Sequence, residues 1–96
     1  MKIKFTKSAH TTFLEALEYI HQNNPYAVEK FRQQAGKSLL RLKQFPESGR
    51  SLPEFPDLIY REVIVQSHRF FYRVAGNIIL VVAVWHSAQQ PELPNE

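Results

Sequence analysis

The sequence predicts one α+β domain in which a small, twisted antiparallel sheet carries a helical hairpin on one face. Three observations lead to this prediction: a short alternating segment opens the chain, two amphipathic helical segments follow it, and three strand-like runs come after them. The 96 residues suffice for one compact core. We expect the domain to occupy residues 1–90 and an irregular, proline-containing tail to occupy residues 91–96.

The first strand and the first helix are predicted from local patterns. Residues Lys2–Thr6 alternate apolar side chains with lysine or threonine, which is typical of a half-buried strand. Ser8 is expected to cap a helix over residues 8–22. The apolar residues that recur at helical spacing in this segment are Phe13, Leu17 and Ile20, with Ala9 and Ala16 beside them.

The second helix has the clearest pattern in the chain. Asn24 followed by Pro25 predicts its start, since asparagine accepts hydrogen bonds at a helix N-cap and proline needs no amide partner there. Phe45-Pro46 predicts its end. Its apolar stripe consists of Val28, Phe31, Ala35, Leu39 and Leu42.

A proline-rich loop over residues 46–58 precedes three predicted strands. These strands are Tyr60–Val65, His68–Val74 and Ile78–His86. The last strand is apolar on both faces, which predicts a central position in the sheet.

Gly76-Asn77 is typical of a two-residue hairpin loop, which places Ala75 opposite Ile78. If this register continues, Arg69 faces Val84 and His68 faces Trp85. Strand alternation then places one set of side chains on the open face of the sheet: Arg69, Phe71, Arg73, Val82, Val84 and His86. The set predicted to meet the helices is Phe70, Tyr72, Val74, Val81 and Trp85.

The face of Arg61 depends on the turn at Gln66-Ser67. A two-residue turn points Arg61 towards the helices, whereas a three-residue turn joins it to Arg69 and Arg73. We favour the second arrangement, because an arginine is costly to bury without a partner.

Composition narrows the function classes. The chain has no cysteine, no apolar run long enough to cross a bilayer and no signal-peptide pattern at its start, so we expect a cytoplasmic protein that does not associate with membranes. The formal charge is +3, and nine bases fall between Lys30 and Arg73 against four acids. This excess of bases has two explanations. The bases bind an anionic partner such as nucleic acid or an acidic peptide, or they lie on a helix face that only contacts water.

The candidate site residues also have structural explanations. Arg69 and Arg73 have two equally favoured kinds of partner. One is an acid of the chain itself, either Glu62 or an acid of the tail, and the other is a ligand. His86 lies at a strand end, where most histidines are structural. The predicted register sends His68 and His86 to opposite faces, so we expect no metal site, and the chain has no phosphate-binding glycine loop, so we expect no cofactor.

Four strings and their spacing resemble the RelE/ParE superfamily of toxins from type II toxin–antitoxin systems. The resemblance covers residues 3–90, and its strings are Phe45–Arg50, Tyr60–Val63, Ser67–Val74 and Val84–Gln89. It implies a small twisted sheet with a helical hairpin against it, in agreement with the fold predicted from the residues.

The resemblance implies one of two activities. The ParE branch poisons DNA gyrase without cleaving nucleic acid, whereas the RelE branch cleaves messenger RNA on the ribosome and needs no metal. The sequence is closer to the ParE branch, because no lysine follows Lys43, no tyrosine follows Tyr72, and the closing string has a histidine followed by small residues and glutamine. For a nuclease, the resemblance implies His86 for proton transfer, Arg61, Arg69 and Arg73 for charge stabilisation, and Glu47, Glu54 or Glu62 as the base.

The resemblance also implies a cognate antitoxin encoded nearby. Its acidic or amphipathic segment is expected to fill apolar gaps near Phe71 and Val82 and to neutralise Arg61, Arg69 and Arg73, with His86 in the same surface. An exposed edge at Tyr60–Val65 would suit a homodimer or an added strand of a partner. A further alternative is a non-toxic nucleic-acid-binding module that uses the five bases of the second helix.

Overall fold

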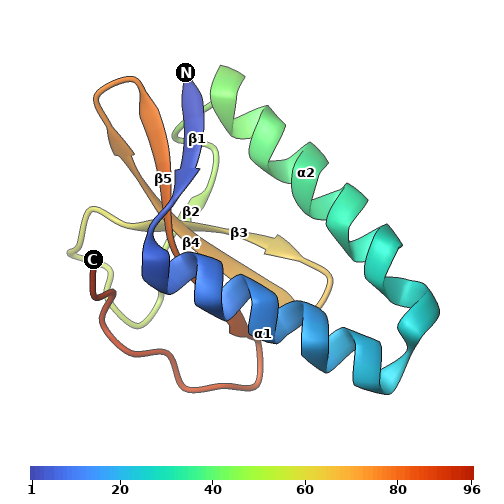
Figure 1. Cartoon of the computed structure of the whole chain (residues 1–96). Helices are drawn as coiled ribbons and strands as arrows, with labels where there is room; N and C mark the ends of the chain where they lie inside the picture. The colour runs from blue at the N-terminus through green and yellow to red at the C-terminus, as the bar shows by residue number, and fades with distance from the viewer.

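A computed structural model describes all 96 residues and has two helices on one face of a five-stranded sheet (Figure 1). The elements in chain order are β1 (Lys2–Phe5), α1 (Lys7–Asn23), the short 3-10 helix η1 (Pro25–Ala27), α2 (Val28–Gln44), β2 (Arg50–Ser51), β3 (Arg61–Val65), β4 (His68–Ala75) and β5 (Ile78–His86). The strand order β1-β5-β4-β3-β2 places β5 inside the sheet, as predicted. The α+β class and the helical hairpin on one face are confirmed.

The sheet is mixed rather than wholly antiparallel. β1 runs parallel to β5, with Lys2 beside Ile78 and Phe5 beside Val81, while the other neighbouring strands are antiparallel. The prediction of an antiparallel sheet was therefore wrong for β1. Alternation of apolar and polar residues is the same for both strand directions, so it predicts a strand but not its orientation.

The starts of both helices differ in detail from the prediction. Thr6, not Ser8, caps α1, since its hydroxyl oxygen accepts a hydrogen bond from the Ala9 amide at 3.0 Å. Asn24 does act as a cap, but its side chain accepts from the Tyr26 amide and begins η1, after which α2 starts at Val28. Neither helix is long and apolar enough to cross a membrane.

The main core lies between the helices and the sheet. Phe31 of α2 is fully buried and its ring packs 6.1 Å from that of Phe70 in β4. Phe13 of α1 lies against both rings, at 6.3 Å from Phe31 and 6.0 Å from Phe70. Aromatic pairs at these separations add to the area that they bury. The apolar stripe predicted for the second helix is confirmed as the buried face of α2: Phe31, Ala35, Leu39 and Leu42 are all buried.

The register of β4 and β5 shifts by one residue part-way along the hairpin. Near the turn, Arg73 pairs with Leu80 and Ala75 with Ile78, as predicted. A β-bulge at Phe71/Tyr72 then adds one residue on β5, so that Phe71 pairs with Ala83 and His68 with His86.

This shift corrects the predicted faces of β5. His86 and Val84 lie on the helix side with His68, and Trp85 packs on the opposite side, so the predicted separation of His68 from His86 was wrong. The reason is that one extra residue reverses the side-chain alternation beyond it.

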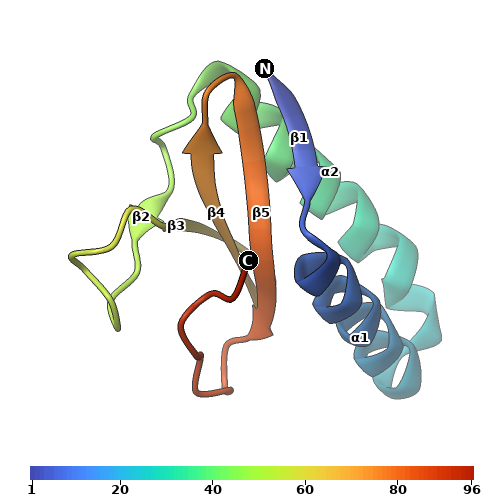
Figure 2. The same cartoon turned by 60° about the vertical axis from the view of Figure 1, so that its left-hand side comes forward.

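The sheet face away from the helices, here called the outer face, is covered by the chain itself. The segment of residues 52–60 between β2 and β3 and the C-terminal tail lie on this side (Figure 2). Leu52 is fully buried against Phe71, Val82 and Ala83. Phe71 and Val82 are consequently buried, and the predicted open apolar gaps beside them are filled by Leu52.

Gly49 stands where three parts of the chain meet. Its amide donates a hydrogen bond to the Tyr72 hydroxyl at 3.0 Å, and that hydroxyl donates to the Pro46 carbonyl at 2.7 Å. The Gly49 carbonyl accepts a hydrogen bond from Arg61 at 2.9 Å. A Cβ atom at residue 49 would come within 2.7 Å of the Glu62 carbonyl oxygen and 2.6 Å of the Tyr72 hydroxyl.

We expect Gly49→Ala to lower the free energy of unfolding by about 2–3 kcal/mol, because backbone must move to admit the methyl group. Gly36→Ala is the matched control, since residue 36 is an exposed helical position with nothing within 4 Å. The control should raise stability by about 0.5–1 kcal/mol through helix propensity. Chemical denaturation measures both, and equal stability of the two variants would contradict the close approach at Gly49.

Candidate functional site

The residues predicted to form one functional face are divided between the two faces of the sheet. Arg69, Phe71 and Arg73 of β4 share the outer face, as predicted, whereas Arg61 and His86 lie on the helix side. Arg61 pairs with Tyr72, and His86 pairs with His68. The backbone positions of Arg61 and His86 are therefore two strands and four residues apart, which is roughly 15 Å. The predicted gathering of three arginines and one imidazole does not occur.

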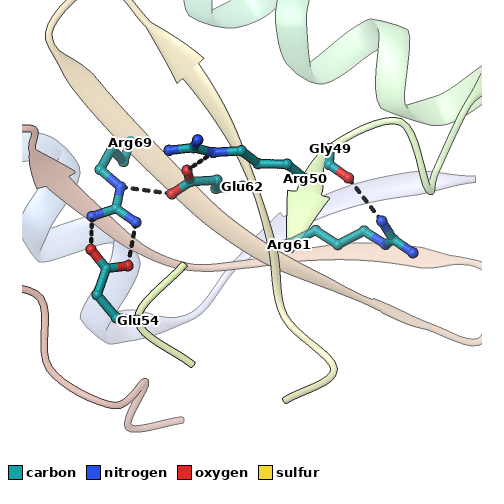
Figure 3. Close-up of polar contacts among 6 residues, drawn as sticks. All are labelled: Gly49, Arg50, Glu54, Arg61, Glu62 and Arg69. Atoms are coloured by element: carbon teal, nitrogen blue, oxygen red, sulfur yellow. Dashed lines mark hydrogen bonds and ion pairs between the residues drawn. The ribbon is translucent and has the colours of Figure 1, made fainter. Parts of the chain in front are cut away.

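Arg61 is separated from Arg69 by the turn between β3 and β4. Val65 pairs with His68, so the turn contains only Gln66 and Ser67. The favoured three-residue turn was therefore wrong: Gln66 adopts a left-handed conformation with φ of 55°, which closes the tighter turn. Arg61 has a partner on the helix side, since its guanidinium donates a hydrogen bond to the Gly49 carbonyl (Figure 3). The residue is also only partly buried.

Arg69 is held in an internal ion-pair network on the outer face. Its Nε donates to Glu62 at 2.6 Å, and its two terminal nitrogens donate to the carboxylate oxygens of Glu54 at 2.8 and 2.7 Å (Figure 3). Arg50 approaches Glu62 from the other side. The guanidinium also stacks 5.0 Å from the centre of the Phe71 ring.

The positive charge of Arg69 is balanced by the carboxylates of this network. Its side chain is 7% exposed, and the pKa of Arg69 is raised by hydrogen bonds from its guanidinium to Glu54 and then to Glu62. Those same hydrogen bonds from Arg69 lower the pKa of Glu54. The alternative that Arg69 pairs with Glu62 is confirmed. The pairing of Arg69 with Glu54 was not predicted, since the sequence analysis names Glu54 only as a possible base of a nuclease.

Arg73 is paired with the C-terminal tail. Its Nε and Nη2 donate to the Glu96 carboxylate at 3.0 and 2.7 Å, and the hydroxyl of Tyr60 donates to the same carboxylate. Hydrogen bonds from Arg73 and then Tyr60 lower the pKa of Glu96. The alternative that Arg73 pairs with an acid of the tail is confirmed.

His86 lies in a group of aromatic rings on the helix side. Its ring centre is 5.2 Å from that of His68 and 5.1 Å from that of Tyr19 in α1. Its Nδ1 accepts a hydrogen bond from the Ala88 amide at 3.0 Å. No three His, Cys, Asp or Glu side chains lie together in a way that could hold a metal ion.

A group of unpaired bases lies on α2 instead. Its five bases are all exposed and none forms an ion pair: Lys30, Arg32, Lys37, Arg41 and Lys43. Arg41 and Arg50 line a groove of about 350 Å³ between α2 and β3, together with Ser38, Ser48, Val63 and Glu62, the acid that pairs with Arg50. We call this groove the basic groove.

One wall of the basic groove is an unpaired strand edge. β2 covers only Arg61 and Glu62 of β3, which leaves Val63–Val65 without a neighbouring strand on that side. The side chain of Ile64 on this edge is 52% exposed. Free backbone groups beside the unpaired Arg41 and the exposed part of Arg50 form a surface that an acidic extended segment can pair with.

The comparisons with known proteins identify the family. The family model described as the ParE toxin of the type II toxin–antitoxin system parDE matches residues 3–91. The chain belongs to this family. It is the toxin component of a type II toxin–antitoxin system, which confirms the resemblance and its ParE branch, and membership implies a cognate antitoxin as its partner.

The fold of this ParE-family toxin is also found among solved structures. It is similar to a chain of the chromosomal ParDE toxin–antitoxin system from P. aeruginosa, with a TM-score of 0.71 and 18% sequence identity. The match covers 90% of this chain and 95% of the other. No curated protein sequence matches the toxin significantly.

We expect Arg69→Met to lower the free energy of unfolding of the toxin by about 3–5 kcal/mol, because it leaves the buried Glu62 carboxylate without its internal partner. Arg73→Met, in the same strand, should have a much smaller effect, since its pair with Glu96 is at the surface. Urea denaturation of both variants measures the difference. A stable Arg69→Met variant would show that the network does not support the fold.

Proposed function

We propose that this toxin arrests growth by binding and poisoning DNA gyrase in the cytoplasm, without cleaving messenger RNA. The observation that carries the proposal is the separation of the groups that RNA cleavage would use. Such chemistry needs a cation and a proton-transfer group around one phosphate. Arg69 is neutralised by Glu54 and Glu62, and His86 lies roughly 15 Å from Arg61. Membership of the ParE family supports the same target.

The basic groove is proposed as the docking site of the antitoxin. An extended antitoxin segment would pair with the free edge at Val63–Val65 and place carboxylates between Arg41 and Arg50. This differs from the sequence-based expectation of docking on Phe71 and Arg73, because the outer face is already covered by the chain. A homodimer through the same strand edge is the competing occupant.

The exposed bases of α2 favour a second candidate function, that of a nucleic-acid-binding module. Five unpaired cations along one helix suit phosphate contacts, and such binding would weaken as salt concentration rises. Neutralising Lys37 and Arg41 would then lower the affinity for nucleic acid.

Induced expression without antitoxin should arrest growth, and purified toxin should inhibit gyrase supercoiling or trap gyrase cleavage complexes. His86→Ala should leave this inhibition within about twofold of the unchanged toxin, since the proposal gives its imidazole no chemistry. Message cleavage on programmed ribosomes, lost in His86→Ala, would refute the gyrase proposal in favour of the nuclease. Salt-sensitive nucleic-acid binding without growth arrest would favour the binding module.

The double variant Arg41→Ala/Arg50→Ala should escape the antitoxin, with affinity at least about tenfold lower, because two charge-assisted contacts are lost. Lys30→Ala is the matched control, since it removes a base of α2 that does not border the basic groove. Affinity is measured by titration with cognate antitoxin, and toxin mass in solution tests the homodimer. Equal affinities of the double variant and the control would place the antitoxin elsewhere.

A further inference from the structure

A cavity of about 390 Å³ lies between α1 and the end of β5, on the helix side of the sheet. Its volume is within the range of small-ligand sites. It shares no lining residue with the basic groove. The side chains that give it its chemistry come from α1, β4, β5 and the turn after β5: Thr12, Glu15, Tyr19, His68, His86 and Gln89.

Three aromatic rings form one wall of this cavity. Tyr19 lies 5.1 Å from His86 and 6.2 Å from His68, and the two imidazoles are 5.2 Å apart. Each pair meets edge to face, so the rings are turned in different directions around the cavity. The electron-rich face of an aromatic ring attracts planar and cationic groups.

His68 lines the cavity with its ring, and one nitrogen of that ring is buried without a hydrogen-bond partner. The residue is 3% exposed, and its Nδ1 has no hydrogen-bond partner. Burial and, to a smaller extent, the neighbouring His86 lower the pKa of His68.

Glu15 gives the cavity a negative charge. It is the only Asp, Glu, Lys or Arg among the residues that line the cavity, it is exposed, and it forms no ion pair. The chain as a whole carries a formal charge of +3, so this region differs in sign from the rest. A cationic ligand is therefore favoured here and an anionic one disfavoured.

We propose that this cavity binds a guanidinium group, carried either by a small molecule or by an arginine side chain of a partner protein. A guanidinium is planar and stacks on aromatic rings, and its several N–H groups reach more than one acceptor at once. Glu15 takes the charge-assisted hydrogen bonds, and Tyr19 and His86 take the stacking contacts. An ammonium group has the charge but not the flat shape.

The inference is independent of the proposed gyrase target and of the basic groove, which lies between α2 and β3. Its test uses the full chain and agmatine as the guanidinium probe. Titration should give saturable changes in the side-chain NMR signals of His68 and His86, and calorimetry gives the dissociation constant. Putrescine, the matched ammonium probe, should bind at least about fivefold more weakly.

Glu15→Gln should weaken agmatine binding by about tenfold or more, because a charged acceptor is replaced by a neutral one. Tyr19→Leu should weaken it through loss of the stacking contact. Glu18→Gln is the matched control on α1, since Glu18 hydrogen-bonds only to Gln22 and does not line the cavity, and it should bind within about twofold of the unchanged toxin.

The source of the guanidinium is separated by a second probe, the peptide acetyl-Gly-Arg-Gly-amide. Binding of the peptide as tightly as agmatine supports an arginine side chain of a partner, and binding of agmatine alone supports a small molecule. The proposal is overturned if neither probe shifts His68 and His86, if putrescine binds as well as agmatine, or if Glu18→Gln loses as much affinity as Glu15→Gln.

Discussion

A single extra residue in β5 decides which side chains share each face of the sheet. On the turn side of the β-bulge the pairing keeps Arg73 opposite Leu80, and beyond it the alternation on β5 is reversed. The end of β1 supports the bulged stretch, because the amide of Thr6 donates to the Val81 carbonyl at 3.0 Å. Without the extra residue, His86 would lie on the outer face, diagonal to Arg69. With it, His86 joins His68 and Tyr19 next to α1, and both the cavity and the ion-pair network are separate sites.

The basic residues of the sequence consequently do not form a basic sheet surface. Arg50, Glu62, Arg69 and Glu54 alternate in sign along one chain of contacts, so their charges cancel. Burying Arg69 would be costly without both carboxylates, and burying Glu62 would be costly without Arg69. This mutual requirement ties residue 54 to the sheet. The positive charge that is available to a partner lies on the bases of α2, which form no ion pair, and on the exposed part of Arg50.

Periodicity was sufficient to predict most of the fold, and the site depended on features that periodicity does not encode. The stripe from Phe31 to Leu42 and the two-sided apolar pattern of β5 predicted a buried helix face and an internal strand. Nothing in Val81–Val84 marks the bulge, since these residues include neither glycine nor proline. The turn at Gln66 is equally unmarked, because a non-glycine residue takes the left-handed conformation there. Two one-residue differences in register therefore redistributed every candidate site residue on β3 and β5.

The strings that carry the family resemblance have structural roles that meet at one place. Gly49 and Arg50 contact Tyr72 and Glu62, and Glu62 contacts Arg69, so three of the four strings are joined by hydrogen bonds and ion pairs. Residues under this constraint specify the fold and carry little information about the target, since one fold hosts different activities. Exposed groups outside this network are free to differ among toxins of the same fold. The bases of α2 and the Glu15 cavity are such groups, and for this reason target, antitoxin and ligand specificity are to be sought on the helices and along the edge of β3.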